Sequence, residues 1–202
     1  MRIMTARIEG TAPYSQSRRY DHAVPKKNKE APDAYDQRTW REHCSVDVGG
    51  FVCIPGMSIK MAIDTAAKKL QEKVPGKGQL KWGGLVMGGV VPSDIMFRIY
   101  VGKNAVKKDD IDYVDLWCDS KGMRNGKSRV MRRYPIIAKG WSADISLDIT
   151  DDSLPADLLE RYLREAGLIV GIGRFRPENG GMNGRFIVKR VSWSALSLEE
   201  AA

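Results

Sequence analysis

Two segments of the chain alternate between apolar and polar residues, as strands with one buried face do. In residues 141–149 every second position is apolar, and the positions between them are serine or aspartate. Residues 3–12 show the same alternation at Met4, Ala6 and Ile8. A period of two predicts strands that place one face on a core and the other face in water.

Two other segments repeat their apolar residues with helical spacing. After Ser58, the expected N-cap, apolar residues recur at steps of three and four over the next twelve positions. A second helix is expected to start at Asp152 or Ser153, with Pro155 in its first turn and Gly167 at its end. Each helix therefore has one apolar face that can pack on a sheet.

Shorter apolar runs complete the predicted sheet. Further strands are expected at residues 50–54, 84–91, 95–101, 129–137 and 185–192. This order predicts a single α+β domain over residues 1–202, with an RRM-like or ferredoxin-like antiparallel sheet and two helices on one face. The other face would remain free, and RRM-type proteins hold single-stranded nucleic acid there.

Two polar stretches interrupt the core pattern. Residues 13–49 contain three prolines and many cations, and we expect a long loop insertion there. Residues 103–135 are polar and strongly charged, which predicts a projecting basic hairpin, or thumb. Long loops often carry function, although an insertion without a role is the alternative for the first stretch.

The overall charge points to an anionic partner. The 202 residues include 33 Lys and Arg against 25 Asp and Glu, a formal net charge of +8 with a pI near 9.4. This balance favours nucleic acid first and an anionic membrane second. No apolar run approaches the roughly 20 residues of a membrane helix, and neither a secretory signal nor a membrane partner is expected.

The three cysteines, Cys44, Cys53 and Cys118, form no CxxC pair. An odd number without such a pair argues against a disulfide scaffold and a zinc module. We therefore expect a cytoplasmic protein that needs no metal and no cofactor.

A glycine-rich segment at residues 171–186 contains Arg174, Phe175 and Arg176. Glycines allow a backbone to approach a bulky anion, arginine can donate two hydrogen bonds to a phosphate, and phenylalanine can stack on a base. The segment leads from a helix to a strand, which is the reverse of the order in a dinucleotide fingerprint. The alternative is a simple turn with Phe186 in the core.

A second candidate is a cluster of cations without an acidic residue between them. Its members are Lys121, Arg124, Lys127, Arg129, Arg132 and Arg133. A basic finger of this kind suits salt-sensitive contacts with a phosphate backbone. The alternative is a solvated charged hairpin.

A third candidate is residues 35–43, where Tyr35 and Trp40 lie among arginines and could stack on bases. The same segment ends in His43 beside Cys44, but adjacency in sequence does not place a base next to a nucleophile. His22 is the other histidine, and neither an HExxH, a P-loop lysine nor a GxSxG motif is present. We therefore expect no enzyme.

Two motifs resemble a known family. Cys53-Ile54-Pro55-Gly56-Met57-Ser58-Ile59-Lys60 is similar to the strand-to-helix junction of the RAMP superfamily, the RRM-like backbone proteins of CRISPR effector complexes. Residues 171–188, ending Gly184-Arg185-Phe186-Ile187-Val188, resemble the glycine-rich loop and following strand of that family. Ile8–Pro13 resembles its first strand, and small phage and prophage proteins share the pattern at Tyr35–Arg41.

The resemblance implies an RRM-like palm, a projecting thumb and binding along a single strand, often as a filament. It places Ser58, Lys60 and the loop Gly173–Arg176 near the strand. Met57 and Met61 depart from the small residues usual in the junction. Some members cut RNA with an aspartate in the first loop, where Asp33 and Asp36 lie here, but no motif identifies either one as its equivalent.

The sequence therefore predicts sequence-independent binding of single-stranded RNA or DNA, as a filament-forming backbone subunit or a phage single-strand-binding protein. Copies could associate along the strand, and no small-molecule substrate is expected. The residues expected to contact the strand are Arg18, Arg19, Tyr35, Arg38, Trp40, Arg41, Ser58, Lys60, Lys77, Lys121, Arg124, Lys127, Arg129, Arg132, Arg133, Gly173, Arg174, Phe175, Arg176 and Arg185.

Two alternative functions stay open. One is a metal-dependent nuclease, with magnesium held by carboxylates among Asp33, Asp36, Asp109, Asp110 and Asp112. The other is a protein-interaction module, such as an inhibitor of a nucleic-acid machine.

Overall fold

The computed structural model of the chain describes residues 1–19, 24–119 and 129–195. The α-helices in this part are α1 (Pro32–Thr39), α2 (Gly56–Leu70), α3 (Trp82–Gly89) and α4 (Ala156–Glu165). Short 3-10 or π-helical segments are η1 (Trp40–His43), η2 (Lys108–Asp110), η3 (Ala166–Val170) and η4 (Pro177–Asn179). The strands are β1 (Arg2–Gly10), β2 (Tyr14–Ser15), β3 (Cys53–Pro55), β4 (Val90–Pro92), β5 (Met96–Arg98), β6 (Tyr100–Val101), β7 (Asn104–Ala105), β8 (Asp112–Asp119), β9 (Arg129–Ile137), β10 (Trp141–Ile149) and β11 (Phe186–Ala195).

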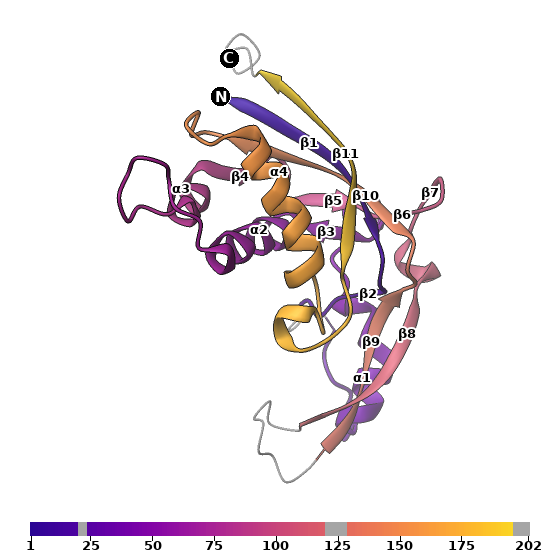
Figure 1. Cartoon of the computed structure of the whole chain (residues 1–202). Coiled ribbons are helices and arrows are strands. Elements are labelled where there is room, and N and C mark those ends of the chain that lie inside the picture. Colours follow the sequence, from indigo (N-terminus) through magenta and orange to yellow (C-terminus); the bar gives the residue numbers. More distant parts are fainter. Residues whose placement is uncertain (20–23, 120–128, 196–202) are drawn as a thin grey trace.

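The largest sheet has the strand order β11-β1-β10-β6-β7, and β4 also pairs with β10. Its strand pairs are antiparallel. Helices α2 and α4 lie on the same side of β1, β10 and β11 (Figure 1). The predicted α+β class with antiparallel sheets is therefore confirmed. None of the helices in the described ranges has the length and apolar character to cross a bilayer.

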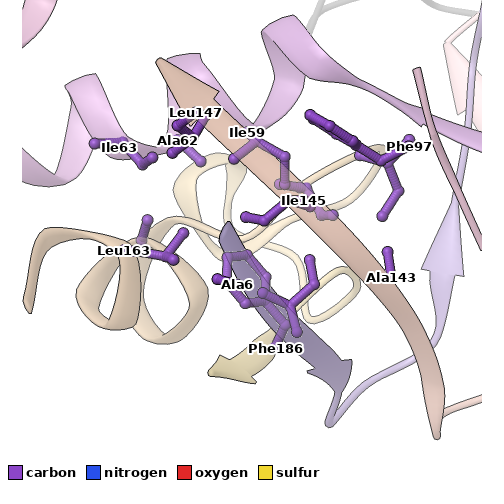
Figure 2. Packing of buried hydrophobic residues seen from close by; sticks show 14 of the residues in the cluster. Ala6, Ile59, Ala62, Ile63, Phe97, Ala143, Ile145, Leu147, Leu163 and Phe186 are labelled. Atoms are coloured by element: carbon purple, nitrogen blue, oxygen red, sulfur yellow. The ribbon is translucent and has the colours of Figure 1, made fainter. Parts of the chain in front are cut away.

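The alternating segments form the centre of this sheet. In the register of β1 with β10, Ala6 lies opposite Ile145, and both side chains are buried. Ile59 and Ile63 of α2 and the ring of Phe186 belong to the same core cluster (Figure 2). A fully buried aliphatic side chain stabilises the fold by about 1.5–3 kcal/mol. The period-two and helical patterns therefore meet in one apolar layer between sheet and helices.

The prediction of a strand at residues 84–91 is wrong for residues 84–89, because Trp82–Gly89 form helix α3, and only Val90 and Val91 belong to a strand, β4. Gly83, Val86 and Gly89 are its buried residues, and their three-residue spacing belongs to a helix face. The four glycines of this helix are poor helix formers. Local preference was therefore a misleading guide, and packing against α2 decides the structure.

Helix α2 begins earlier than predicted, at Gly56 after Pro55, and Ser58 is not its N-cap. A Cβ atom on Gly56 would lie 2.3 Å from the carbonyl oxygen of Asp94. Only glycine therefore allows the strand-to-helix junction to pass this close to the turn before β5.

Helix α4 begins at Ala156 after Pro155, and the predicted stop at Gly167 is wrong. The chain continues through Gly167 as η3 and turns at Gly171, whose φ is +70°. A Cβ atom on Gly167 would lie 2.2 Å from the carbonyl oxygen of Phe186. This glycine therefore serves close packing against β11 and does not end the helix.

Strands β8 and β9 form a hairpin that extends away from the main sheet beside α1 (Figure 1). Strand β2 pairs with the other edge of β9, which gives a second sheet of order β2-β9-β8. The hairpin starts at Asp112, while residues 104–105 form β7 beside β6. Residues 13–49 are not a plain loop, because they contain β2, α1 and η1 with Asp36 and Trp40 buried.

Candidate nucleic-acid interface

A cleft of about 480 Å³ opens where three distant segments of the chain meet. Ser58 lines it from the first turn of α2, Arg18 from the segment after β2, and Gly173–Arg176 from the glycine-rich segment. Buried apolar residues such as Ile172 also line it. Three arginines are among the lining residues, whereas aspartate and glutamate are absent from them. The cleft therefore offers an electropositive surface next to an apolar one.

Backbone contacts fix the glycine-rich segment to β2. The amide of Arg174 donates to the carbonyl oxygen of Ser15 at 2.7 Å. Gly173, with φ of +75°, comes so close to β2 that a Cβ atom would lie 2.4 Å from the same oxygen. On the neighbouring segment, the amide of Arg18 donates to the carbonyl oxygen of His43 at 2.9 Å. The arginines of the cleft are thus carried by fixed backbone.

The side chain of Arg174 is held between aromatic rings. Its guanidinium carbon lies 3.9 Å from the ring centroid of Tyr134 and 4.6 Å from that of Phe175. Its Nη1 atom donates to the Ser17 hydroxyl at 3.1 Å. Phe175 has the unusual φ of +56°, and its ring packs edge-on against Tyr134. These rings orient Arg174, so the stacking face predicted for Phe175 is partly used within the protein.

Arg132 and Arg133 of β9 are also engaged inside the protein. The buried carboxylate of Asp36 accepts hydrogen bonds from the backbone amide of Arg133 at 2.9 Å and from the guanidinium of Arg132 at 3.2 Å. Arg133 donates twice to Asp115 at 2.8 Å and stacks on the ring of Tyr113. Arg132 keeps 37% of its side-chain surface exposed, so it is the better placed of the two for an external phosphate.

Asp36 is therefore an anchor between α1 and the hairpin. Burial alone would raise the pKa of its carboxyl group, but the neighbouring His43 side chain, the Arg133 amide and the Arg132 charge outweigh it and lower the pKa. Asp33, one turn earlier, is exposed. The residues that the structure describes include no group of three His, Cys, Asp or Glu side chains arranged to hold a metal ion.

Trp40 was predicted to stack on bases, but it is only 4% exposed. Its ring packs against Tyr113 at 5.4 Å between centroids, and the Arg41 guanidinium lies 4.3 Å from it. The expected role of Trp40 is therefore wrong for this arrangement. An aromatic residue among arginines gives the same sequence signal whether it faces a base or a core.

Tyr35 and Arg38 of α1 contact the segment that precedes this helix. The Tyr35 hydroxyl donates to the carbonyl oxygen of Val24 at 2.7 Å. Arg38 donates to both carboxylate oxygens of Glu30 at 2.9 Å. The two side chains thus shape the insertion, and any contact that they make with nucleic acid remains a prediction.

Lys60 was expected near the bound strand, but its side chain is buried. Its ammonium group donates to Asp64 at 2.5 Å and to the carbonyl oxygens of Val86 at 3.4 Å and Met87 at 3.0 Å. These carbonyls belong to the last turn of α3, which a cation stabilises. Lys60 therefore joins two helices, and the expectation of a phosphate contact is wrong here.

The other predicted residues are scattered over the surface. Arg19, Lys77 and Arg185 are exposed, and none of them lines the cleft. Lys121, Arg124 and Lys127 lie outside the described residues, and only the backbone of Arg129 is described. The part of the prediction that the fold brings together is thus Arg18, Ser58 and the glycine-rich segment.

The free face of the main sheet differs from the expected RNA-binding face of an RRM. Thr5 bonds to Ser192 across β1 and β11, and Arg7 pairs with Asp144 at 2.5 Å. Hydroxyls and paired charges thus occupy the centre of this face, while the predicted cations and aromatic residues lie elsewhere.

Sequence reasoning missed Gln16 and Tyr134. The buried amide of Gln16 donates to the carbonyl oxygen of Cys53 at 2.7 Å and accepts from the amide of Ser45 at 2.5 Å, which ties the cleft wall to β3. Burial raises the pKa of Tyr134 to about 12, so its ring remains a neutral surface for Arg174. Both residues act through distant partners, and no periodicity or motif marks them.

Comparison with known proteins identifies the fold. The sequence matches no protein-family model and no curated protein. The crystal structure of Cmr6 from Pyrococcus furiosus aligns over 93% of this chain and 98% of that one, with a TM-score of 0.50 and 13% identity. A chain in the cryo-EM structure of the Type III-B Cmr-beta complex bound to cognate target RNA aligns over 95% of this chain, with a TM-score of 0.50 and 11% identity.

This chain spans 60% of the length of the matched Cmr-beta chain. The fold is the α+β fold found in Cmr6 and in the Type III-B complex. The similarity to these two structures agrees with the fold that the motifs at residues 53–60 and 171–188 led us to expect.

Proposed function

We propose that this protein binds the backbone of single-stranded nucleic acid, independently of sequence, in the cleft between α2 and the glycine-rich segment. One observation supports the proposal most directly. The cleft is lined by three arginines and no carboxylate, and these arginines come from two segments that are far apart in the sequence. A net charge of +8 adds long-range attraction for a polyanion.

We assign different tasks to the side chains of the cleft. Arg18 and Arg176 lie at its wall and bind phosphate oxygens, for which guanidinium geometry is well suited. Ser58, in the first turn of α2, donates its hydroxyl where the helix dipole favours negative charge. Arg174 is oriented by Tyr134 and adds a third cation. The apolar lining contacts sugar and base without selecting a sequence.

The bound nucleic acid continues from the cleft to the β8–β9 hairpin, where Arg132 adds a partly exposed cation. RNA is favoured over DNA, because one similar structure is of a complex described as bound to target RNA.

We propose a non-enzymatic subunit of an RNA-containing assembly. The engagement of Asp36 by Arg132 and Arg133 supports an anchoring role for this carboxylate instead of a catalytic one.

Fluorescence anisotropy with labelled single-stranded RNA, single-stranded DNA and duplex DNA over a salt series tests this function. We expect the wild type to prefer single strands. The plot of log K against log salt has a negative slope, and Arg18→Ala/Arg176→Ala should make it less steep by about 1.4. Lys68→Ala/Lys73→Ala is the matched control, because it removes the same charge from exposed positions outside the cleft. No binding at low salt, or equal losses in both double variants, would contradict the proposal.

A further inference from the structure

His43, the last residue of η1, lies between the cleft and the carboxylate that anchors the hairpin. Its backbone carbonyl oxygen accepts a hydrogen bond from the Arg18 amide at 2.9 Å, and its ring nitrogen Nδ1 lies 3.0 Å from the Arg18 carbonyl oxygen. Both backbone polar groups of Arg18 are therefore bound to this one residue. Because Arg18 lines the cleft, His43 fixes the position from which this arginine reaches a ligand.

The other ring nitrogen of His43 faces Asp36. Nε2 lies 4.0 Å from Oδ1 of this carboxylate, and only 16% of the His43 side chain is exposed. The pKa of Asp36 lies below its usual value of 3.8, so the carboxylate is charged at neutral pH. The ring of Tyr134 in β9 also packs against His43, with 5.4 Å between the ring centroids. His43 thus contacts α1, β9 and the segment after β2 at the same time.

The two groups that face the ring nitrogens are both hydrogen-bond acceptors. A neutral imidazole has one N–H donor and one nitrogen lone pair, so it can donate to only one of these two groups. A protonated ring has a donor on each nitrogen and suits both the carbonyl oxygen of Arg18 and the carboxylate of Asp36. The adjacent ring of Tyr134 favours the charged form as well, because a cation is attracted to an aromatic face.

The cations on the neighbouring elements act in the opposite direction. The guanidinium groups of Arg18, Arg132 and Arg174 disfavour a further positive charge on the histidine ring. Two of them are already engaged, because Arg132 pairs with Asp36 at 3.2 Å and Arg174 stacks on the ring of Tyr134. A phosphate bound in the cleft would offset these cations and favour protonation of the ring. Protonation and strand binding would therefore assist each other, because coupling between two sites is reciprocal.

We propose that His43 is a positioning residue of the cleft, whose protonated form holds Arg18 in place for binding a phosphate. The charged ring joins the Arg18 segment to Asp36 and so fixes one wall of the cleft to the hairpin anchor. When the ring loses its proton, one of these two contacts is lost. Histidine ordinarily changes charge between about pH 5 and pH 8, so strand binding becomes tighter toward the acidic end of this range. This inference rests on the proposed function, because it assigns regulation to the same cleft.

Fluorescence anisotropy with a labelled oligouridine RNA tests the proposal at about pH 6 and about pH 8, at one fixed salt concentration. Uracil and the phosphodiesters keep the same charge at both values, so a change in affinity reports on the protein. We expect the wild type to bind about 5-fold more tightly at the lower pH, at the weak end of coupling between two sites.

His43→Asn removes the titrating group and retains a neutral donor, because the asparagine amide nitrogen takes about the position of Nδ1. This variant should bind equally well at both pH values. His22→Asn is the matched control, because it removes the other histidine of the chain and should keep the wild-type ratio of affinities. Circular dichroism verifies that both variants are folded.

A second measurement needs neither a variant nor nucleic acid. The Arg18 amide is bound to the His43 carbonyl oxygen, so its protection against hydrogen exchange, relative to the intrinsic rate at each pH, reports how firmly the segment is held. Protection in the wild type should be greater at about pH 6 than at about pH 8. Equal protection at the two values would overturn the proposal, as would a pH dependence of binding that survives in His43→Asn.

The two proposals can fail separately. Strand binding by the wild type that is the same at both pH values would refute the role of His43 and leave the proposed function standing. Absence of binding at both pH values would refute the proposed function and the effect on affinity, and exchange at the Arg18 amide would then decide whether the protonated ring holds this segment.

Discussion

The main sheet and the β8–β9 hairpin are held in place by different kinds of interaction. Around β1 and β10, the inward positions are aliphatic or aromatic side chains with almost no exposed surface. The hairpin is joined to α1 through Asp36, Arg132 and Arg133, and to the cleft wall through the ring of Tyr134. The sheet is thus a scaffold of apolar packing, while the hairpin depends on the same residue types that bind a polyanion.

This difference implies that the two regions respond differently to substitution and pH. Removal of a large buried side chain leaves a cavity and affects the whole fold. Removal of one member of a polar network leaves its partners without hydrogen bonds and affects mainly the region that they join.

The largest effect is expected for Trp141→Ala in β10. Trp141 is fully buried, and its indole nitrogen donates to the carbonyl oxygen of Ala12 at 2.9 Å. Loss of the ring should lower the free energy of unfolding by about 4 kcal/mol, as measured by urea denaturation. Trp117→Ala on the exposed hairpin face is the control and should change it by less than about 0.5 kcal/mol. Similar losses in both variants would remove the distinction between scaffold and hairpin.

Asp36→Ala should release the hairpin without unfolding the main sheet. The substitution leaves the Arg133 amide and the Arg132 guanidinium without their buried acceptor, at a cost of about 3 kcal/mol. Hydrogen exchange should become faster in β8 and β9 and stay unchanged in β1 and β10. Asp33→Ala, on the same helix but exposed, is the matched control. Unchanged exchange in the hairpin would show that Asp36 does not anchor it.

The two regions that these variants test, the main sheet and the insertions, could be predicted from the sequence to different extents. The predicted strand 141–149 matches β10 at both ends, because its period-two alternation shows which side chains face the core. The predicted strand 129–137 also matches β9 at both ends, although its residues do not alternate. The sequence of the glycine-rich helix α3 shows no pattern that predicts a helix, because glycine occurs in many backbone conformations. Periodicity therefore predicted the scaffold well and gave little information on the insertions.

The sequence predicted which residue types form the candidate site, but only some of the residues that it indicated lie in the cleft. Arg18, Ser58 and Arg176 meet in one cleft, as the family resemblance and the charge pattern allowed. Trp40 and Lys60 carry the same kind of signal but face the interior. A sequence shows which residues can bind a phosphate or stack on a base, while tertiary packing decides which of them remain accessible.

Lys60→Gln tests one of these reassignments. Loss of the ammonium group from Asp64 and from the α3 carbonyls should destabilise the fold by about 2 kcal/mol. The salt dependence of single-strand binding should stay the same, because Lys60 does not contact the strand. Lys68→Gln, on the exposed face of α2, is the control for stability. A lower salt slope for Lys60→Gln at unchanged stability would restore its predicted role in binding.

A smaller effect is expected from acid. Hydrogen bonds from Arg133 lower the pKa of Asp115, and the pKa of Asp36 is also below its usual value of 3.8. A lowered pKa in the folded state contributes stability that is present above the unfolded value and is lost as pH falls through the folded value. The protection of hairpin amides against hydrogen exchange, relative to the intrinsic exchange rate at each pH, should therefore fall below about pH 4. Protection in the main sheet should be lost only at lower pH. Asp36→Asn should weaken this pH dependence, and an unaltered profile would argue against the contribution of Asp36.

The smallest effect is expected for Arg7→Gln on the free face of the main sheet. Arg7 pairs with Asp144 at the surface, and such exposed pairs contribute about 0.2–1 kcal/mol. If the cleft and the hairpin hold the strand, this variant should bind RNA with nearly the wild-type salt slope, although it loses one positive charge. A slope lowered by about 1, as expected for a lost phosphate contact, would instead move the binding surface to the sheet face. Because Arg7→Gln and Arg176→Gln remove the same charge, their comparison measures position alone.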